Sequence, residues 1–232
     1  YNNLYSYINK NHFISDKHSG YRRGDSTVKQ LLSITNEIHK TFDEGKELRA
    51  VFLDISRAFD RVWHSGLLFK LKQIGIEGQA LDIVKDFLTN REQRVVIDGQ
   101  FSEWAPITAG VPQGSILGPL LFLVYINDIT EVISSDIRIF ADDTFIFRTA
   151  DSDSTRLLNN DLEKITDWAW TWKMLFNPDI SKQAVEVIFS NKKDTSVHLP
   201  LIFNGIPVKL VKETKHLGMI LDSKLSYNSH LE

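Results

Sequence analysis

Two adjacent carboxylates, Asp142 and Asp143, stand between two short apolar runs, and no other feature of the chain constrains its fold as strongly. Apolar side chains alternate on both sides of the pair, at Ile137, Ile139, Ala141, Phe145 and Phe147. This alternation predicts a β-hairpin with the acid pair at its tip. Adjacent like charges repel one another, and either bulk water at an ordinary turn or a bound divalent cation relieves the repulsion. Taken alone, the segment favours the solvated turn.

A third carboxylate, Asp54, has a similar setting. Residues 50–53 are apolar, as in a short buried strand, and Asp54 stands at the C-terminal end of this run. One acid at a strand end and two at a hairpin tip are the minimum set for two Mg²⁺ ions, which lie about 3.5–4 Å apart in nucleotidyl transfer. Carboxylate oxygens suit such hard cations, and phosphate oxygens of a substrate would complete each coordination shell.

A loop rich in glycine and proline lies between these acids in the chain, at residues 108–119. Its glycines allow the backbone to approach a ligand closely, and the apolar residues 120–126 that follow predict a buried helix. Gln113 stands on this loop, where its amide suits contact with a nucleotide or a templating strand. A turn of this composition before a buried helix is common, so the loop is weak evidence by itself.

Together, the three segments resemble the reverse transcriptase domain of non-LTR (LINE-type) retrotransposons, specifically the jockey and CR1-like group. The resemblance covers nearly the whole chain, and six motifs follow the order of the family. They are residues 18–27 (fingers motif), 54–60 (first catalytic palm motif), 109–119 (template and nucleotide motif), 140–143 (aromatic-Ala-Asp-Asp motif), 176–178 with Lys182 (next palm motif) and 216–222 (primer grip). The departures are Phe140, where many relatives carry Tyr, and a long interval between Asn177 and Lys182.

The resemblance implies that Asp54, Asp142 and Asp143 are the catalytic residues and the ligands of two Mg²⁺ ions, with Mn²⁺ as a possible substitute. The backbone carbonyl of Ile55 is expected to add one further metal ligand. Residues expected to bind the nucleotide are Arg22, Arg23, Phe59, Gln113, Gly114 and Lys182. The expected primer grip consists of His216, Leu217, Gly218 and Met219.

Two of these assignments have a physical reason beside the resemblance. The ring of Phe59 would fill the space that a ribose 2′-hydroxyl needs, so it would select deoxynucleotides by collision, whereas ordinary core packing is the alternative. Arg22 and Arg23 carry guanidinium forks that match phosphate oxygens, although isolated arginines more often lie on the surface. The sequence does not rank these two arginines.

The implied function is RNA-directed DNA polymerisation, with an RNA template, a DNA primer and dNTPs as partners. One alternative is a catalytically inactive remnant that still binds nucleic acid. An RNA-dependent RNA polymerase shares the acid geometry, but Phe59 and the close match of residues 109–119 oppose it. An unrelated Mg²⁺ phosphatase would need a nucleophilic Asp motif, which the sequence does not show.

Composition is consistent with a globular domain: 42% of the 232 residues are hydrophobic and 25% are charged. The net charge of -3 is unexpected for a polymerase, although residues 182–224 carry seven lysines against four acids. The absence of cysteine excludes disulfides and thiolate metal sites. No apolar run approaches the roughly 18 residues of a membrane span. We therefore expect an intracellular protein with no membrane partner, and the resemblance implies a nuclear and cytoplasmic ribonucleoprotein.

Helical spacing of apolar residues predicts helices at residues 25–42, 65–74, 79–89 and 154–175. Strands are predicted at residues 49–54, 184–189 and 214–221. Asp98-Gly99 and Asn204-Gly205 predict two further hairpins, with strands at residues 93–97 and 101–107 and at residues 201–203 and 206–210. Trp168, Trp170 and Trp172 favour packing under the sheet over stacking on bases.

Strands interleaved with helices predict an α+β fold. The resemblance makes this the right-hand polymerase fold, with partial fingers at residues 1–49 and mainly palm, with fingers insertions, at residues 50–232, ending near the primer grip. It also implies that the thumb is missing and that the chain is a fragment of the domain. We therefore expect residues 1–232 alone to bind template and primer weakly.

Overall fold

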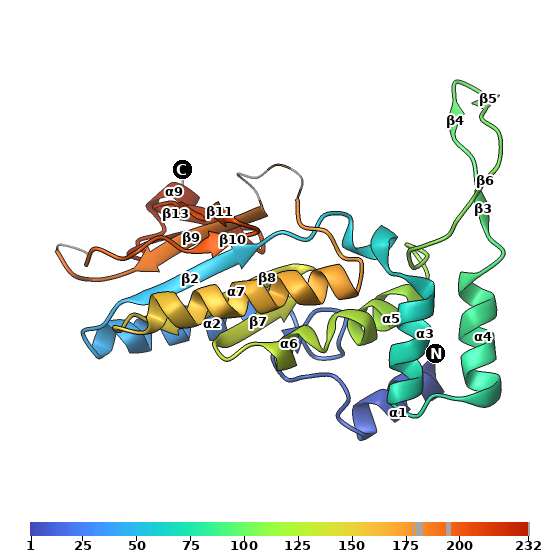
Figure 1. Cartoon of the computed structure of the whole chain (residues 1–232), viewed down its shortest axis with the longest axis horizontal. Coiled ribbons are helices and arrows are strands. Elements are labelled where there is room, and N and C mark those ends of the chain that lie inside the picture. The colour runs from blue at the N-terminus through green and yellow to red at the C-terminus, as the bar shows by residue number, and fades with distance from the viewer. Residues whose placement is uncertain (178, 180–182, 194–195, 232) are drawn as a thin grey trace. The chain divides into compact units, whose positions relative to one another are not determined.

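The computed structural model describes residues 1–177, 179, 183–193 and 196–231 (Figure 1). The chain divides into two compact units, each assembled from segments that are distant in sequence. Unit 1 contains Tyr1–Ile14, Arg57–Asn127 and Trp172–Met174. Unit 2 contains Ser15–Ser56, Asp128–Thr171 and Leu175–Glu232. All three predicted catalytic acids therefore belong to unit 2.

The core of unit 2 is a mixed sheet in which the strand order is β1-β7-β8-β2-β9-β12. The strands are β1 (His18–Ser19), β2 (Leu48–Leu53), β7 (Asp136–Phe140), β8 (Asp143–Thr149), β9 (Ala184–Phe189) and β12 (Lys209–Leu210). The predicted strands at residues 49–54 and 184–189 are confirmed. Every residue of β2 is buried, because this strand pairs antiparallel with β8 on one side and with β9 on the other.

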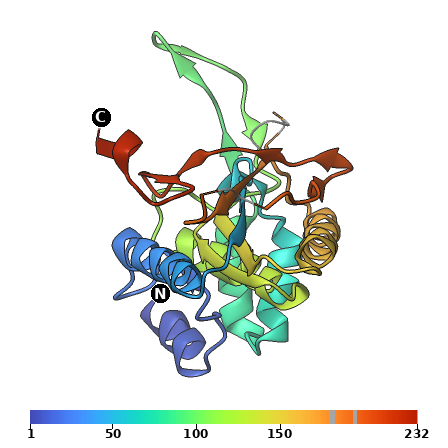
Figure 2. The same ribbon diagram turned by 90° about the vertical axis from the view of Figure 1, so that its left-hand side faces the viewer.

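Two helices cover the opposite faces of this sheet, α2 (Thr27–Asp43) and α7 (Ser154–Thr171), as Figures 1 and 2 show. Ser26 caps the N-terminus of α2, because its side chain accepts a hydrogen bond from the backbone N–H of Lys29. Its buried face carries Ile34, Ile38 and Phe42, which pack against β2, β8 and β9. Val28 and Leu32 have the helical spacing of a buried face as well, but both are 62% exposed, because the buried stripe follows Gln30 and Ile34.

Helix α7 begins as predicted but ends at Thr171, four residues before the predicted end. Lys173 adopts a left-handed φ of +56°, which stops the helix, and Phe176 then forms a β-bridge with Ile55. Trp168 is buried, as predicted for core packing, whereas Trp170 is 84% exposed and that prediction is wrong for it. Trp172 lies beyond the helix, in unit 1.

Smaller elements complete unit 2: α6 (Ile129–Val132), β10 (Ile202–Phe203), β11 (Ile206–Pro207), β13 (Glu213–His216), β14 (Met219–Asp222) and α9 (Asn228–Leu231). The hairpin at Asn204-Gly205 is confirmed, although it is shorter than predicted. The single strand predicted at residues 214–221 is wrong, because β13 and β14 form a hairpin. Leu217 and Gly218 make its turn, with φ values of +49° and +85°.

Unit 1 is mainly helical. Its helices are α1 (Asn2–Lys10), α3 (His64–Gln73), α4 (Gly78–Leu88) and α5 (Leu117–Ile126), with the short 3₁₀ turn η1 (Ala58–Arg61). The sequence predicted α3, α4 and the buried helix α5, but not α1. A two-stranded ribbon follows α4 and consists of β3 (Glu92–Gln93), β4 (Val96–Ile97), β5 (Gln100–Phe101) and β6 (Ala105–Pro106), turning at Asp98-Gly99 as predicted. In the described residues, no helix is long and apolar enough to cross a membrane.

Candidate active site

The predicted acid hairpin is confirmed. Phe140 pairs with Asp143 across the ends of β7 and β8, so Ala141 and Asp142 form a two-residue turn. Ala141 has a φ of +56°, a left-handed conformation that is uncommon for a residue with a side chain. Asp142 is half-buried on the turn, and Asp143, the more exposed of the two, begins β8. The carboxylates thus stand at the tip of the hairpin rather than inside the sheet.

The fingers motif supports this turn directly. Strand β1 runs parallel to β7, and the backbone N–H of Ala141 donates to the carbonyl of Ser19 at 3.2 Å. His18, beside Ser19, is fully buried, and burial lowers the pKa of its imidazole to about 3. His18 is therefore a neutral core residue. Residues 18–20 belong to the predicted fingers motif, but their contact with the turn that carries the acid pair was not predicted.

Asp54 follows β2 directly and is fixed by its neighbours in unit 2. Its backbone N–H donates to the carbonyl of Gln183 at 3.1 Å, and its own carbonyl accepts from the N–H of Asn177 at 3.0 Å. The side-chain amide of Asn177 donates to Oδ2 of Asp54 at 2.7 Å. The motif beginning at residue 176 therefore orients the carboxylate of Asp54. Sequence reasoning gave Asn177 no role of its own.

The charge of Asp54 reaches both members of the acid pair. Partial burial, followed by the charges of Asp142 and Asp54, raises the pKa of Asp143 to about 6. Burial and the charge of Asp54 also raise the pKa of Asp142. Such mutual repulsion is relieved when a cation binds among the oxygens.

The donor set fits Mg²⁺ in its chemistry, because it consists of carboxylate oxygens alone. Among the described residues, however, no group of three or more His, Cys, Asp and Glu side chains already surrounds a common metal position. Ile55 is buried next to Asp54 and forms the β-bridge to Phe176. The proposed role of its carbonyl as a metal ligand stays a prediction.

Arg22 and Arg23 differ in their surroundings. Arg22 is part-buried, and its Nη1 donates to the carbonyls of Ser15 and His18 at 2.9 and 3.0 Å. Arg22 therefore holds its own loop together. Arg23 is exposed. Tyr21, the neighbour of Arg22 in the loop, has a pKa that is raised by burial and by the charge of Asp142.

Phe59, Gln113 and Gly114 belong to unit 1, where one backbone bond and one side-chain bond join the Phe59 segment to the Gln113 loop. The N–H of Val111 donates to the carbonyl of Phe59 at 2.9 Å, and Nε2 of Gln113 donates to Oδ1 of Asp60 at 2.8 Å. The ring of Phe59 is half-buried and stacks on Phe122, with centroids 4.4 Å apart. Gly114 has a φ of +78°, and a Cβ there would meet no described atom within 4 Å.

The predicted primer grip is the hairpin of β13 and β14. His216 is buried, its ring lies 5.1 Å from Phe52 and 6.0 Å from Phe145, and burial lowers its pKa to about 4. Leu217 and Gly218 form the turn, and Met219 begins the second strand. The hairpin therefore packs beneath the strands that carry Asp54 and Asp143. Lys182, expected to bind the nucleotide, lies outside the described residues, as does Pro178.

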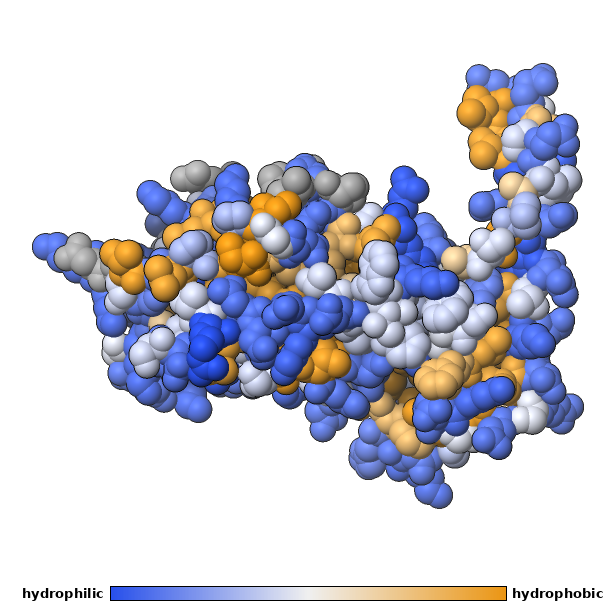
Figure 3. Space-filling view, viewed as in Figure 1, coloured by the Kyte–Doolittle hydropathy of each residue, from blue (hydrophilic) through white to orange (hydrophobic). Residues whose placement is uncertain are grey.

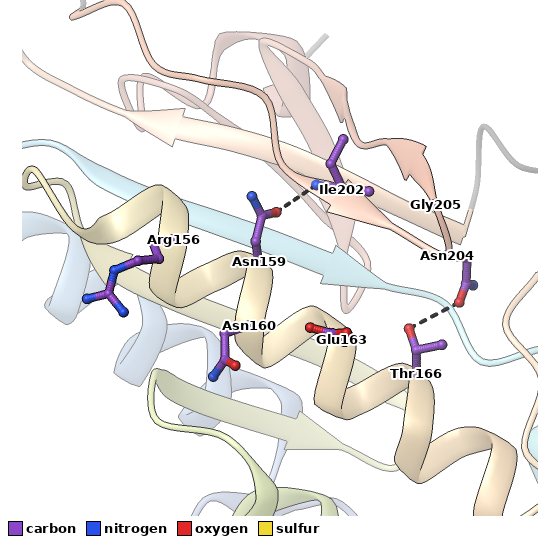
Figure 4. Close-up of a pocket in the computed structure, with 8 residues that line it drawn as sticks. All are labelled: Arg156, Asn159, Asn160, Glu163, Thr166, Ile202, Asn204 and Gly205. Carbon is purple, nitrogen blue, oxygen red and sulfur yellow. Dashed lines mark hydrogen bonds between the residues drawn. The ribbon is translucent and has the colours of Figure 1, made fainter.

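A groove of about 540 Å³ lies elsewhere in unit 2, between α7 and the hairpin of β10 and β11 (Figure 4). Asn159 accepts a hydrogen bond from the backbone N–H of Ile202 at 2.7 Å, and Thr166 donates to Asn204 at 3.1 Å. These bonds fasten the hairpin to the helix. None of the predicted site residues lines the groove, so it is separate from the acid turn.

Comparison with known proteins gives concordant results in sequence and in structure. A family model described as reverse transcriptase (RNA-dependent DNA polymerase) matches residues 1–221. The RNA-directed DNA polymerase from mobile element jockey of Drosophila melanogaster is 35% identical, over 91% of this chain and 24% of the relative. The probable RNA-directed DNA polymerase from transposon BS of the same species is 30% identical, over 100% of this chain and 26% of the relative.

Solved structures of telomerase have a similar fold. Telomerase from Candida albicans, in complex with a TWJ fragment of telomeric RNA, gives a TM-score of 0.62 at 13% identity, over 94% of this chain and 36% of that chain. Apo telomerase from Candida tropicalis gives a TM-score of 0.62 at 11% identity, over 94% of this chain and 38% of that chain. The predicted right-hand polymerase fold is confirmed by these neighbours.

Proposed function

The chain belongs to the reverse transcriptase family, and we propose that it catalyses RNA-directed DNA synthesis as part of a non-LTR retrotransposon polymerase. It spans 24% and 26% of the length of the two curated relatives named above. One observation carries the proposal: Asp54, at the end of β2, lies close enough to the hairpin turn within unit 2 for its charge to raise the pKa of both Asp142 and Asp143. Three mutually repelling carboxylates on a strand end and a turn suit divalent cations better than they suit a structural role.

The chain's own residues would prepare the site in two ways. Asn177 holds one oxygen of Asp54, which leaves the other oxygen of that carboxylate for a ligand. The left-handed turn at Ala141 presents Asp142 and Asp143 together. Bound Mg²⁺ would lower the pKa of the primer 3′-hydroxyl and stabilise the pyrophosphate leaving group. The side chains therefore position ions and substrate and make no covalent bond.

Nucleotide selection is assigned to unit 1. The stacked ring of Phe59 is held by Phe122, and this rigidity suits a residue that excludes a 2′-hydroxyl by collision. Gln113 and Gly114 are exposed on the adjoining loop, where backbone and amide are accessible to a nucleotide or template base. In unit 2, exposed Arg23 suits a triphosphate contact, and Arg22 orders the loop that presents it.

The decisive experiment is primer extension on an RNA template with Mg²⁺ or Mn²⁺, comparing dNTPs with rNTPs. Asp142→Asn should lower incorporation by roughly 10²–10³-fold or more, because the isosteric amide keeps the shape of the turn but loses the charge. Asp136→Asn is the matched control, since it removes an exposed carboxylate from the start of the same hairpin. Equal activity of the two variants would refute the metal assignment. Template binding without incorporation by the wild type would instead identify the nucleic-acid-binding remnant.

A further inference from the structure

The ribbon of residues 91–107 exposes large hydrophobic side chains without a partner sheet. In the described part of the chain, β3 pairs only with β6 and β4 only with β5. Val95, Val96, Ile97, Phe101 and Trp104 are each more than half exposed. Figure 1 shows the ribbon extending beyond α4 of the same unit, and Figure 3 shows hydrophobic residues gathered at its end. An isolated two-stranded hairpin is marginally stable in water, so this exposure points to a binding role.

The two faces of the ribbon differ in chemistry. Val96 pairs with Phe101 and Ile97 with Gln100, so successive side chains place Phe101 and Ile97 on opposite faces. The guanidinium carbon of Arg94 lies 4.0 Å from the ring centroid of Phe101 and 4.6 Å from that of Trp104. We call these three residues (Arg94, Phe101 and Trp104) the ring face. The stacked guanidinium restricts both rings and keeps its N–H groups at the edge of the stack.

The base of the ribbon opens into a cavity of unit 1 with a volume of about 550 Å³. Its lining includes two arginines, Arg57 and Arg91, together with Gln93 of β3. The same cavity is lined by residues 109–113, the loop that carries Gln113. One continuous surface of unit 1 therefore joins the proposed nucleotide and template loop to the ribbon.

We propose that the ring face binds unpaired template RNA, with bases stacked on Phe101 and Trp104 and a phosphate held by Arg94. The proposal rests on the function proposed above and extends its template contacts from the Gln113 loop onto the ribbon. Every base has a π-face, so such a platform accepts any sequence, and a duplex does not offer its bases to it. The positively charged side chains of Arg57 and Arg91, which line the cavity, suit the phosphate backbone of the same RNA strand.

Stacking rather than charge carries this contact. The ribbon carries three acidic residues (Glu92, Asp98 and Glu103) and two arginines (Arg91 and Arg94), so it has no excess of positive charge. Binding that depends on counterion release alone would be steeply salt-dependent. The contribution of the two rings, Phe101 and Trp104, should change little with salt, because stacking on a ring releases no condensed counterions.

The test is fluorescence anisotropy with a labelled single-stranded RNA and the 232-residue chain, without Mg²⁺ or dNTPs. Trp104→Ala and Phe101→Ala should each weaken RNA affinity by roughly tenfold, since each removes one stacking surface. Ile97→Ala is the matched control, because it removes a similarly exposed side chain from the opposite face. The tenfold loss should be the same at low and high salt, and duplex RNA should compete poorly.

Two outcomes would overturn the proposal. One is equal affinity of Trp104→Ala, Phe101→Ala and Ile97→Ala for single-stranded RNA. The other is unchanged RNA affinity together with loss of self-association in sedimentation, which would make the ribbon a protein-binding surface between copies. Binding is measured without catalysis, and Asp142→Asn should leave it unchanged, so failure of the proposed polymerase activity would be seen separately.

Discussion

Gly20 lies so close to Ala141 that a Cβ atom on Gly20 would fall 2.9 Å from the backbone nitrogen of Ala141. Ala141 is the left-handed turn residue immediately before Asp142, and its N–H is already bonded to Ser19. A side chain at residue 20 would therefore push the turn that carries the acid pair away from β1. The fingers motif thus fixes the position of the acids as well as presenting its arginines.

Gly20→Ala should lower the rate of single-nucleotide incorporation by roughly 10–100-fold, because a small displacement of catalytic groups is costly. Gly24→Ala is the matched control: Gly24 has a φ of +84°, close to the +86° of Gly20, but a Cβ there would meet no described atom within 4 Å. Both variants therefore carry the same backbone strain, and only one disturbs the turn. Measured rates and melting temperatures separate the two effects, and equal rate losses would show that strain alone is responsible.

Asn177 offers a second test, since its amide donates to Asp54 at 2.7 Å. Asn177→Ala should lower activity or apparent Mg²⁺ affinity by roughly 10–100-fold, as is usual when the partner of a metal ligand is lost. Asn177→Asp should be worse, because it adds a fourth negative charge beside the first three. Asn159→Ala is the control, as it removes a bond of equal length in the same unit, away from the acids. The effect is measured by titrating Mg²⁺ and recording the incorporation rate of each variant. Titration curves that coincide for the wild type and all variants would contradict this role of Asn177.

Local pattern was enough to predict the elements that carry the acids. The alternation around Asp142 and Asp143 gave the hairpin, and the apolar run before Asp54 gave its strand, because both depend on neighbours in the chain. The strand at Ala184–Phe189 has the predicted bounds for the same reason. The strand end at Asp54 and the hairpin tip at Asp142 and Asp143 were therefore predictable from short segments.

Features that depend on distant segments were not predictable. Val28 and Leu32 have helical spacing, yet the sheet meets the stripe of Ile34 and Ile38 instead. The exposure of Trp170 follows from the same cause, since only one side of α7 faces the sheet. The bond between Asn177 and Asp54 joins residues 123 positions apart, and no local pattern signals it.

The stability of unit 2 should depend on pH through Glu47. Burial alone would raise the pKa of this carboxyl, but hydrogen bonds from the backbone and side chain of Ser196, from His198 and from Ser190 lower it to about 2. A carboxyl whose folded pKa lies below its unfolded value stabilises the fold at neutral pH. That contribution is lost as pH falls from the unfolded pKa of 4.5 to about 2.

Glu47→Gln should therefore lower the free energy of unfolding at pH 7 by about 2 kcal/mol, because hydrogen bonds to a charged group become weaker neutral ones. The difference between wild type and variant should shrink steadily below pH 4.5. Chemical denaturation at a series of pH values measures that difference directly. A gap that stays constant from pH 7 to pH 3 would mean that the charge of Glu47 contributes nothing.

Phe59 gives the last prediction, because its ring is held against Phe122 with an interplanar angle of 19°. Phe59→Val should relax discrimination against rNTPs more than it lowers dNTP incorporation, since the smaller side chain opens space without touching a carboxylate. Phe69→Val is the control, as Phe69 is an exposed phenylalanine on α3 of the same unit. The ratio of kcat/KM for rNTP and dNTP should rise in the first variant alone. If the ratio keeps its wild-type value while the melting temperature falls, Phe59 is a packing residue and discrimination against ribose must arise elsewhere.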